Sequence, residues 1–204
     1  MRRRVRLSLL CKMAVFAAPL LHLPSLGAAE NKPSPAANNS QVSSSAFEAM
    51  MPVLRHPRCM NCHSSGDFPR QGDDSHPHIM DVRRGPDGHG MNGVKCSTCH
   101  QDHNLLGIHM PPGAPDWSLP SPSAPMIWEG LSDHQLCQLF KDPTRNGHRA
   151  VAQIVEHMHT PLVLWGWNPG EGRTPIPYSE PRFLENVKLW ADNGAACPAN
   201  HANH

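Results

Sequence analysis

Two short pentads constrain this chain more than any other part of its sequence. Residues 59–63 read Cys-Met-Asn-Cys-His and residues 96–100 read Cys-Ser-Thr-Cys-His, so both have the form C-x-x-C-H. This is the pattern of a c-type haem attachment site, in which two thiols bond to the porphyrin and the histidine binds its iron. Two intervening residues let both sulfurs reach the porphyrin from a single backbone turn. The pentads predict two covalently attached haem c groups, held by Cys59, Cys62, His63, Cys96, Cys99 and His100.

Structural zinc is the alternative, because two C-x-x-C pairs also describe a four-thiolate site. Zinc does not require a histidine after each second cysteine, and the interval of 33 residues between Cys62 and Cys96 is longer than is usual in a zinc ribbon. Composition favours haem as well. The 204 residues include 22 Pro and 15 Gly, and only 5% are aromatic, so a covalently held apolar cofactor would supply part of the core.

The first 29 residues have the organisation of a secretory signal peptide. Four arginines precede an apolar run at residues 13–21, and small residues follow up to Ala29, where we expect cleavage. Lys12 and Pro19 interrupt the apolar stretch, which leaves it too short to span a bilayer. We therefore expect a periplasmic protein without stable membrane insertion after signal removal. Because bacteria attach haem to cytochromes c outside the cytoplasm, export also favours haem over zinc.

The charge balance excludes a nucleic-acid-binding protein. Residues 1–29 contain five of the 18 basic residues and no acidic ones, so the mature chain would carry 13 Lys and Arg against 17 Asp and Glu. No basic patch suited to a phosphate backbone remains. We therefore expect no nucleic-acid partner.

The pattern along the chain predicts a mainly α fold with extensive loops. Residues 30–45 are small and polar, which predicts a disordered leader. A loop-rich di-haem-binding region spans 46–125 and opens with a short helix at 46–54 that Pro52 limits. A C-terminal helical region, 126–199, packs on it, with helices expected after Ser132, from about His148 and after Ser179. Residues 200–204 form a tail. We expect a small cytochrome c-like di-haem fold with a C-terminal helical layer.

Cysteines and histidines outside the pentads suggest further roles. Cys137 and Cys197 are the remaining cysteines after residue 29, and in an oxidising compartment they are expected to form a disulfide. Each iron also needs a distal ligand or an open position. His78, His109 and His157 are the candidate distal ligands, because the first two adjoin a pentad in flexible stretches and the third lies on a predicted helix face.

Nine stretches of the sequence, which include both pentads, carry a resemblance to a family of bacterial proteins. They are His56 to His63, Gln71-Gly72-Asp73, Arg84 to Gly88, Cys96 to His100 with Asn104, Pro112 to Trp117, Trp128 to Leu131, Lys141-Asp142-Pro143, Trp165-Gly166-Trp167 and Gly194 to Pro198. With them the chain resembles exported di-haem cytochrome c-like proteins catalogued as isoquinoline 1-oxidoreductase subunits. The enzyme in that name is a molybdenum hydroxylase with iron–sulfur centres, for which this chain has no cysteine set. The resemblance therefore implies a small haem protein that accepts electrons from such a dehydrogenase.

These observations favour a periplasmic di-haem c-type cytochrome that transfers single electrons to or from a redox protein partner. Such a protein is an electron carrier or electron-transfer subunit rather than an independent catalyst. Two alternatives stay open. One is a haem enzyme, peroxidase-like or a small-molecule oxidoreductase, with one open distal site. The other is a zinc-stabilised interaction module.

Overall fold

A computed structural model describes residues 34–200, so the expected signal peptide and nearly all of the expected tail lie outside it. The described part is mainly helical, which confirms that aspect of the predicted fold class. Its longer helices are α1 (Pro35–Leu54), α3 (Asp133–Lys141), α4 (Val151–Met158) and α6 (Glu180–Asp192). The shorter ones are α2 (Pro57–Met60), α5 (Pro161–Leu164) and three 3-10 turns, at Ile79–Asp81, Cys96–Thr98 and Trp165–Trp167.

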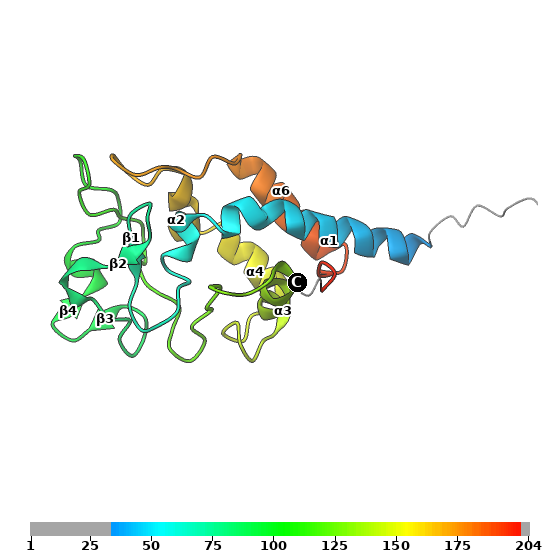
Figure 1. Cartoon of the computed structure of the whole chain (residues 1–204), viewed down its shortest axis with the longest axis horizontal. Helices are drawn as coiled ribbons and strands as arrows, with labels where there is room; N and C mark the ends of the chain where they lie inside the picture. Colours follow the sequence, from blue (N-terminus) through cyan, green and yellow to red (C-terminus); the bar gives the residue numbers. More distant parts are fainter. Residues whose placement is uncertain (1–33, 201–204) are drawn as a thin grey trace, which may run out of the picture. The chain divides into compact units, whose positions relative to one another are not determined.

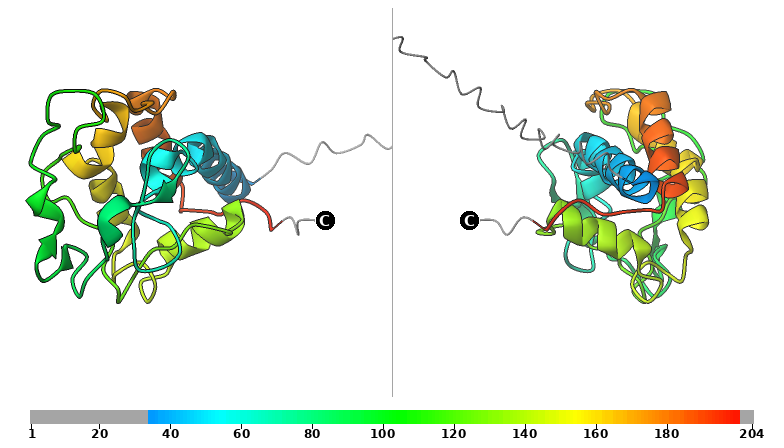
Figure 2. Two further views of the ribbon diagram at one scale, coloured as in Figure 1. Left: turned by 60° about the vertical axis from the view of Figure 1, so that its left-hand side comes forward. Right: turned by 90° about the vertical axis from the view of Figure 1, so that its right-hand side faces the viewer.

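Four very short strands form two antiparallel hairpins between the pentads. Strands β1 (Arg70–Gln71) and β2 (His76–Pro77) make the first, with Gln71 opposite His76. Strands β3 (Gly90–Met91) and β4 (Val94–Lys95) make the second, which leads directly into the second pentad. Figure 1 shows these hairpins and their long loops to one side of the longer helices, and Figure 2 shows the same part of the chain from two further directions. The part of the chain between and after the pentads is therefore loop-rich, as its Gly and Pro content predicts.

The predicted disordered leader is wrong for residues 35–45, which form the first half of α1. Pro35 opens this helix, and the Ser34 hydroxyl caps it by accepting a hydrogen bond from the Ala37 amide at 3.2 Å. Farther along, the fully buried Ser43 hydroxyl donates to the Trp190 carbonyl at 2.7 Å and accepts from the Ala196 amide at 2.8 Å. A small polar side chain lets α1 approach α6 closely, so tertiary contacts stabilise a helix whose sequence looks disordered.

Pro52 does not limit the helix either, because it lies inside the last turn of α1. There it removes one intrahelical hydrogen bond, and Arg55 closes the helix by donating its backbone N–H to the Met51 carbonyl at 2.9 Å. Helix α1 is the longest helix described and runs alongside α6 (Figure 1). Its buried face begins at Ser43, whereas residues 35–42 are exposed and follow the Ser34 cap.

The three C-terminal helices are confirmed with slightly shifted bounds. At the start of α3, Ser132 and Gln135 form a capping box, in which each side chain bonds the other residue's backbone N–H at 3.2 and 2.8 Å. Helix α4 begins at Val151, three residues after the expected position near His148, and α6 begins after Ser179 as expected. The sequence signals for helix starts therefore hold in this half of the chain.

The core lies where α1, α3, α4 and α6 meet. Phe47 of α1 packs edge to face on Phe140 of α3 and tilted on Trp190 of α6, with ring centroids 5.8 and 5.5 Å apart. Trp128, from the loop before α3, continues this aromatic cluster with its centroid 5.3 Å from that of Phe140. Trp128 also contacts the first pentad, so the core extends to the candidate site.

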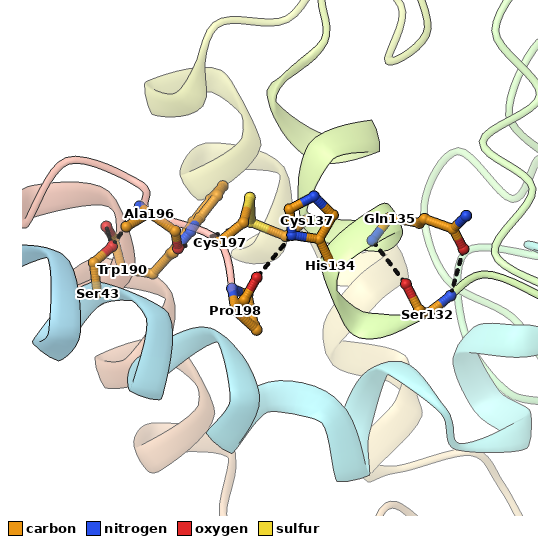
Figure 3. Close-up of a disulfide and its surroundings, with 9 residues drawn as sticks. All are labelled: Ser43, Ser132, His134, Gln135, Cys137, Trp190, Ala196, Cys197 and Pro198. Carbon is orange, nitrogen blue, oxygen red and sulfur yellow. Dashed lines mark hydrogen bonds between the residues drawn. A yellow bond between two sulfur atoms is a disulfide. The ribbon is translucent and has the colours of Figure 1, made fainter. Parts of the chain in front are cut away.

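The expected disulfide between Cys137 and Cys197 is present, with Cα atoms 5.5 Å apart. It joins α3 to the segment that follows α6 (Figure 3). Next to it the Pro198 carbonyl bonds Nδ1 of His134 at 2.7 Å, and Ser43 holds the Ala196 amide. The chain end is therefore fixed to α1 and α3 by hydrogen bonds as well as by the covalent link. Within residues 34–200, no helix is long and apolar enough to cross a membrane.

Candidate cofactor sites

The two pentads have the same backbone turn. In the first, which begins in α2, the amides of Cys62 and His63 both donate to the Cys59 carbonyl at 3.2 Å. In the second, the amides of Cys99 and His100 both donate to the Cys96 carbonyl, at 3.2 and 2.9 Å. Residues three and four positions apart lie on one side of such a turn. Each pentad thus carries its two thiols and its imidazole on one side, as the spacing predicts.

The His63 imidazole is held by the loop before α3. Its Nδ1 lies 2.9 Å from the Met126 carbonyl, and its ring stacks on Trp128 with centroids 3.7 Å apart and planes 5° from parallel. The Trp128 amide also donates to the His63 carbonyl at 2.9 Å. Because Nδ1 donates to a carbonyl in the neutral ring, Nε2 keeps a free lone pair. That nitrogen is the one that can bind a metal.

The His100 imidazole has an equivalent environment built from a different loop. Its Nδ1 lies 2.7 Å from the Pro112 carbonyl, and its ring stacks on Trp117 with centroids 4.5 Å apart and planes 6° from parallel. Two unrelated segments thus give both pentad histidines the same two contacts, a carbonyl on Nδ1 and a tryptophan on the ring face. A carbonyl on the remote nitrogen is the usual support of a metal-binding histidine.

Asn104 shapes the loop that supports His100. Its side-chain oxygen accepts from the Gly113 amide and from Trp165 Nε1, both at 3.0 Å, and its side-chain nitrogen donates to the Asn168 carbonyl at 2.8 Å. Gly113 passes so near residues 101–103 that a Cβ would lie 2.2 Å from a backbone oxygen. Only glycine fits here, which fixes where the Pro112 carbonyl lies.

A cavity of about 610 Å³ opens beside the first pentad and is lined by Cys59, Cys62 and His63 together. This volume lies within the range of roughly 300–1,000 Å³ that small-molecule and cofactor pockets occupy. Most of its other walls are apolar. They include Leu54, Met126, Phe140, Ile154, Met158, Leu162, Val163 and Phe183. Both thiols and the imidazole therefore face one apolar hollow of a cofactor's size.

Two buried donors beside this cavity lack an acceptor. Arg58 Nε and Trp128 Nε1 have no hydrogen-bond partner among the described residues, and both side chains line the cavity. An unpaired buried donor is costly, by about 1–3 kcal/mol, unless a bound group satisfies it. Arg149 also lines the cavity, and two acidic residues, Asp87 and Asp116, line it as well. These donors and the apolar walls fit a cofactor that is flat and apolar with anionic edges, as haem is.

Burial sets the protonation of the first pentad. Together with a smaller contribution from a neighbouring thiol in each case, it raises the pKa of the Cys59 thiol to about 12 and that of Cys62 to about 11. Burial also lowers the pKa of His63 to about 3, although the bond to Met126 acts the other way. At neutral pH the site therefore holds two protonated thiols, slow to form a disulfide, and a neutral imidazole ready for a metal. The pKa of His100 is lowered for the same reason.

The two sites adjoin one another. Trp117 stacks on His100 and also lines the cavity of the first pentad, and it packs edge to face on Trp165 with centroids 4.9 Å apart. Cys62 and Cys96 are close enough for the charge of one to raise the pKa of the other. Cofactors held at the two pentads would therefore lie near each other.

The three candidate distal histidines lie in different places. His157, on α4, lines the cavity with His63 and lowers the pKa of His63 by its charge. His78 lies beside His100, with ring centroids 6.1 Å apart. His109 contacts neither pentad imidazole through any aromatic or hydrogen-bonding interaction of the described residues; its amide donates to the Glu171 carbonyl at 3.1 Å. Each pentad histidine thus has one further histidine near it.

The surroundings of the second pentad are much more open than those of the first. Cys99 is exposed, whereas the other three pentad thiols are half-buried. Large apolar side chains nearby in the sequence are exposed too. They are Ile79, Met80, Met91, Val94, Leu106, Ile108 and Met110. Exposed apolar surface of this extent fits a site that an apolar group covers.

Sequence reasoning missed the residues that support the pentad histidines. The carbonyls of Met126 and Pro112 have no side-chain signal, and the supporting tryptophans follow their carbonyls at different spacings, two residues for Trp128 and five for Trp117. No repeated motif therefore marks them. Only their shared contact with a pentad histidine identifies them.

Within residues 34–200, no group of three or more His, Cys, Asp or Glu side chains converges as a metal site. The four pentad thiols are free and do not gather into one cluster there. The chain matches no protein-family model, no curated protein and no solved structure. The geometry of the two pentads therefore carries the functional inference.

Proposed function

We propose that this protein is a di-haem c-type cytochrome of the periplasm that transfers single electrons. The observation that carries this proposal is the matched environment of the two pentads, each with one backbone turn, one imidazole bonded through Nδ1 to a carbonyl and one stacked tryptophan. A zinc site would use all four thiols at one centre, whereas these contacts prepare two separate imidazoles for two metals. Haem bound at such a site supplies one-electron exchange at iron.

In this proposal each residue of the pentads has one role. Cys59 and Cys62 hold the first haem, Cys96 and Cys99 hold the second, and the following histidines are proximal iron ligands. The tryptophans and carbonyls keep those imidazoles from rotating and exclude water from one ring face. Covalent attachment suits a chain in which the second site is largely open, because non-covalent burial there would be weak. The fold would then be a small cytochrome c-like one.

We propose a redox protein as the partner, and the resemblance implies a dehydrogenase of the molybdenum hydroxylase type. Two adjoining sites suit a carrier, because an electron accepted at the exposed second site can pass towards the buried first site through the contacts of Trp117. Burial in an apolar cavity and the ligand set tune the potential of each iron. Differing exposure of the two sites predicts two different potentials.

Co-expression with a cytochrome c maturation system tests the attachment. The periplasmic protein is expected to contain two covalent haems per chain by pyridine haemochrome assay, and mass spectrometry should place one on each pentad. The double variant Cys59→Ala/Cys62→Ala should keep one haem, and so should Cys96→Ala/Cys99→Ala. A protein without haem that binds one zinc ion in wild-type form, and loses it in either double variant, would overturn the proposal.

A haem enzyme is the second candidate, and the cavity at the first pentad favours it. A haem held there would keep one axial position open if His157, which lines the same cavity, does not reach the metal. Ferric spectra separate the two functions. Two low-spin irons that do not react with peroxide support a carrier, whereas a high-spin iron at the first pentad that reacts with peroxide supports an enzyme.

A further inference from the structure

The side chain of His78 lies across from the imidazole of the second pentad. The ring centroids of His78 and His100 are 6.1 Å apart, and their planes make an angle of 64°. We propose that His78 is the second axial ligand of the iron held by His100. This inference rests on the proposed function, because it assigns a residue to one of the two haems.

The separation of the two rings agrees with ligation of one metal by both. A metal–imidazole nitrogen bond of about 2.0 Å, with about 1.2 Å more to the ring centre, places two opposed imidazole centroids about 6.4 Å apart. The observed separation of 6.1 Å is about 0.3 Å shorter than this span, so a small movement of one ring would admit the metal. Axial imidazoles can adopt any angle about the axis through the metal, so the 64° between the planes is compatible with it.

The hydrogen bonds of both rings leave the same nitrogen free. His78 Nδ1 lies 2.7 Å from the Ile79 carbonyl, and His100 Nδ1 lies 2.7 Å from the Pro112 carbonyl. A neutral imidazole that donates from Nδ1 has its lone pair on Nε2. Both histidines therefore have the tautomer with a free lone pair on Nε2, which a metal requires. An edge-to-face contact between two rings would not by itself require this tautomer in both.

The backbone holds His78 at this position. The residue follows the β1–β2 hairpin directly, and its amide donates to the Pro69 carbonyl at 3.0 Å. Its neighbour Ile79 donates its amide to the Gln71 side chain at 3.4 Å. His109, the other candidate beside a pentad in the sequence, is instead tied to the loop at Glu171. The hairpin therefore selects His78 over His109.

Ligation by two imidazoles has a chemical consequence. It closes both axial positions of the second iron, so that haem can exchange electrons but cannot bind peroxide or another small ligand. It also gives a lower reduction potential than ligation by one histidine and one methionine. The exposed site would then be an electron entry or exit point and not a catalytic centre.

The spin state of the ferric protein tests the assignment. In wild-type protein, electron paramagnetic resonance should show a low-spin signal from the second iron. His78→Ala should keep two covalent haems per chain but convert that iron to high spin, and added imidazole should restore the low-spin signal. His78→Met should keep it low-spin and raise the potential of one haem only. His103→Ala, at an exposed histidine three residues after His100 whose side chain has no hydrogen bond among the described residues, is the matched control and should change neither the spin state nor the potential of either haem.

A second background assigns the effect to one haem. In Cys59→Ala/Cys62→Ala, which retains the second haem only, His78→Ala should convert all the iron to high spin; in Cys96→Ala/Cys99→Ala it should convert none. If His78→Ala keeps both haems and its low-spin signal is unchanged, the assignment is wrong, and His78 makes only an aromatic contact with His100. Absence of haem from the wild-type protein would instead overturn the proposed function. Circular dichroism of each variant checks that it folds.

Discussion

The Cys137–Cys197 disulfide should contribute several kcal/mol to stability, and the double variant Cys137→Ala/Cys197→Ala measures it. The two cysteines are 60 residues apart in the sequence. In the chain-entropy model, opening a loop of this length lowers the free energy of unfolding by about 4 kcal/mol at 25 °C. The reason is that the unfolded chain without the cross-link can adopt more conformations. That is a large part of the roughly 5–15 kcal/mol that stabilises a domain.

Because native hydrogen bonds around the disulfide remain in the double variant, its loss of stability reports mainly on the unfolded state. His134 holds the Pro198 carbonyl and Ser43 holds the Ala196 amide, so the chain end keeps two anchors when the sulfurs are removed. We therefore expect the variant to fold, with an unchanged circular dichroism spectrum.

Urea unfolding of the haem-loaded protein, followed by far-ultraviolet circular dichroism, gives the free energy and the slope with denaturant. In the double variant the urea concentration at the midpoint of unfolding should fall. The slope of the free energy of unfolding with urea concentration should rise, because a chain without the cross-link exposes more surface when unfolded. Wild-type protein treated with a thiol reductant is the control, since thioether bonds to haem survive reduction, and it should show the same loss. A loss below about 1 kcal/mol in both would refute the loop-entropy argument.

Three further predictions concern the candidate sites. His157→Ala should leave two haems attached and convert the iron at the first pentad to high spin in ferric spectra; an unchanged spectrum would exclude His157 as its ligand. Trp128→Ala removes a buried ring stacked on His63, so urea titration should show a loss of about 3–5 kcal/mol, and a loss under 1 kcal/mol would contradict that role. In haem-free protein the free energy of unfolding should fall as the pH decreases from about 6.5 towards 3. His63 takes up a proton in the unfolded chain over this range but stays neutral in the folded protein, where burial lowers its pKa to about 3. A free energy of unfolding that does not change between pH 7 and 5 would contradict this.

Local signals in the sequence predicted local structure well. The start of α3 follows from Ser132 and Gln135, whose reciprocal bonds involve residues three positions apart, and the turn of each pentad follows from its own spacing. The disulfide followed because only two cysteines after residue 29 lay outside the pentads. In each case the interaction lies within one turn or has a single possible partner.

Features that depend on distant contacts could not be predicted in this way. The first half of α1 looks disordered by composition, yet Ser43 bonds to residues near 190 and 196, which the sequence of the helix does not contain. His78 and His109 looked equivalent as loop histidines beside a pentad. The β1–β2 hairpin turns one towards His100, whereas the contact with Glu171 holds the other elsewhere.

By itself the sequence determined the chemistry that the two pentads can perform, because thiols and an imidazole at fixed spacing need only one turn of backbone to act together. Tertiary structure alone decided what surrounds them. The Met126 and Pro112 carbonyls select the nitrogen that stays free, and the tryptophans fix the rings. The placement of α4 and of the β1–β2 hairpin decides which further histidine lies near each pentad histidine. These contacts join segments far apart in the chain, so their partners follow from packing and not from spacing.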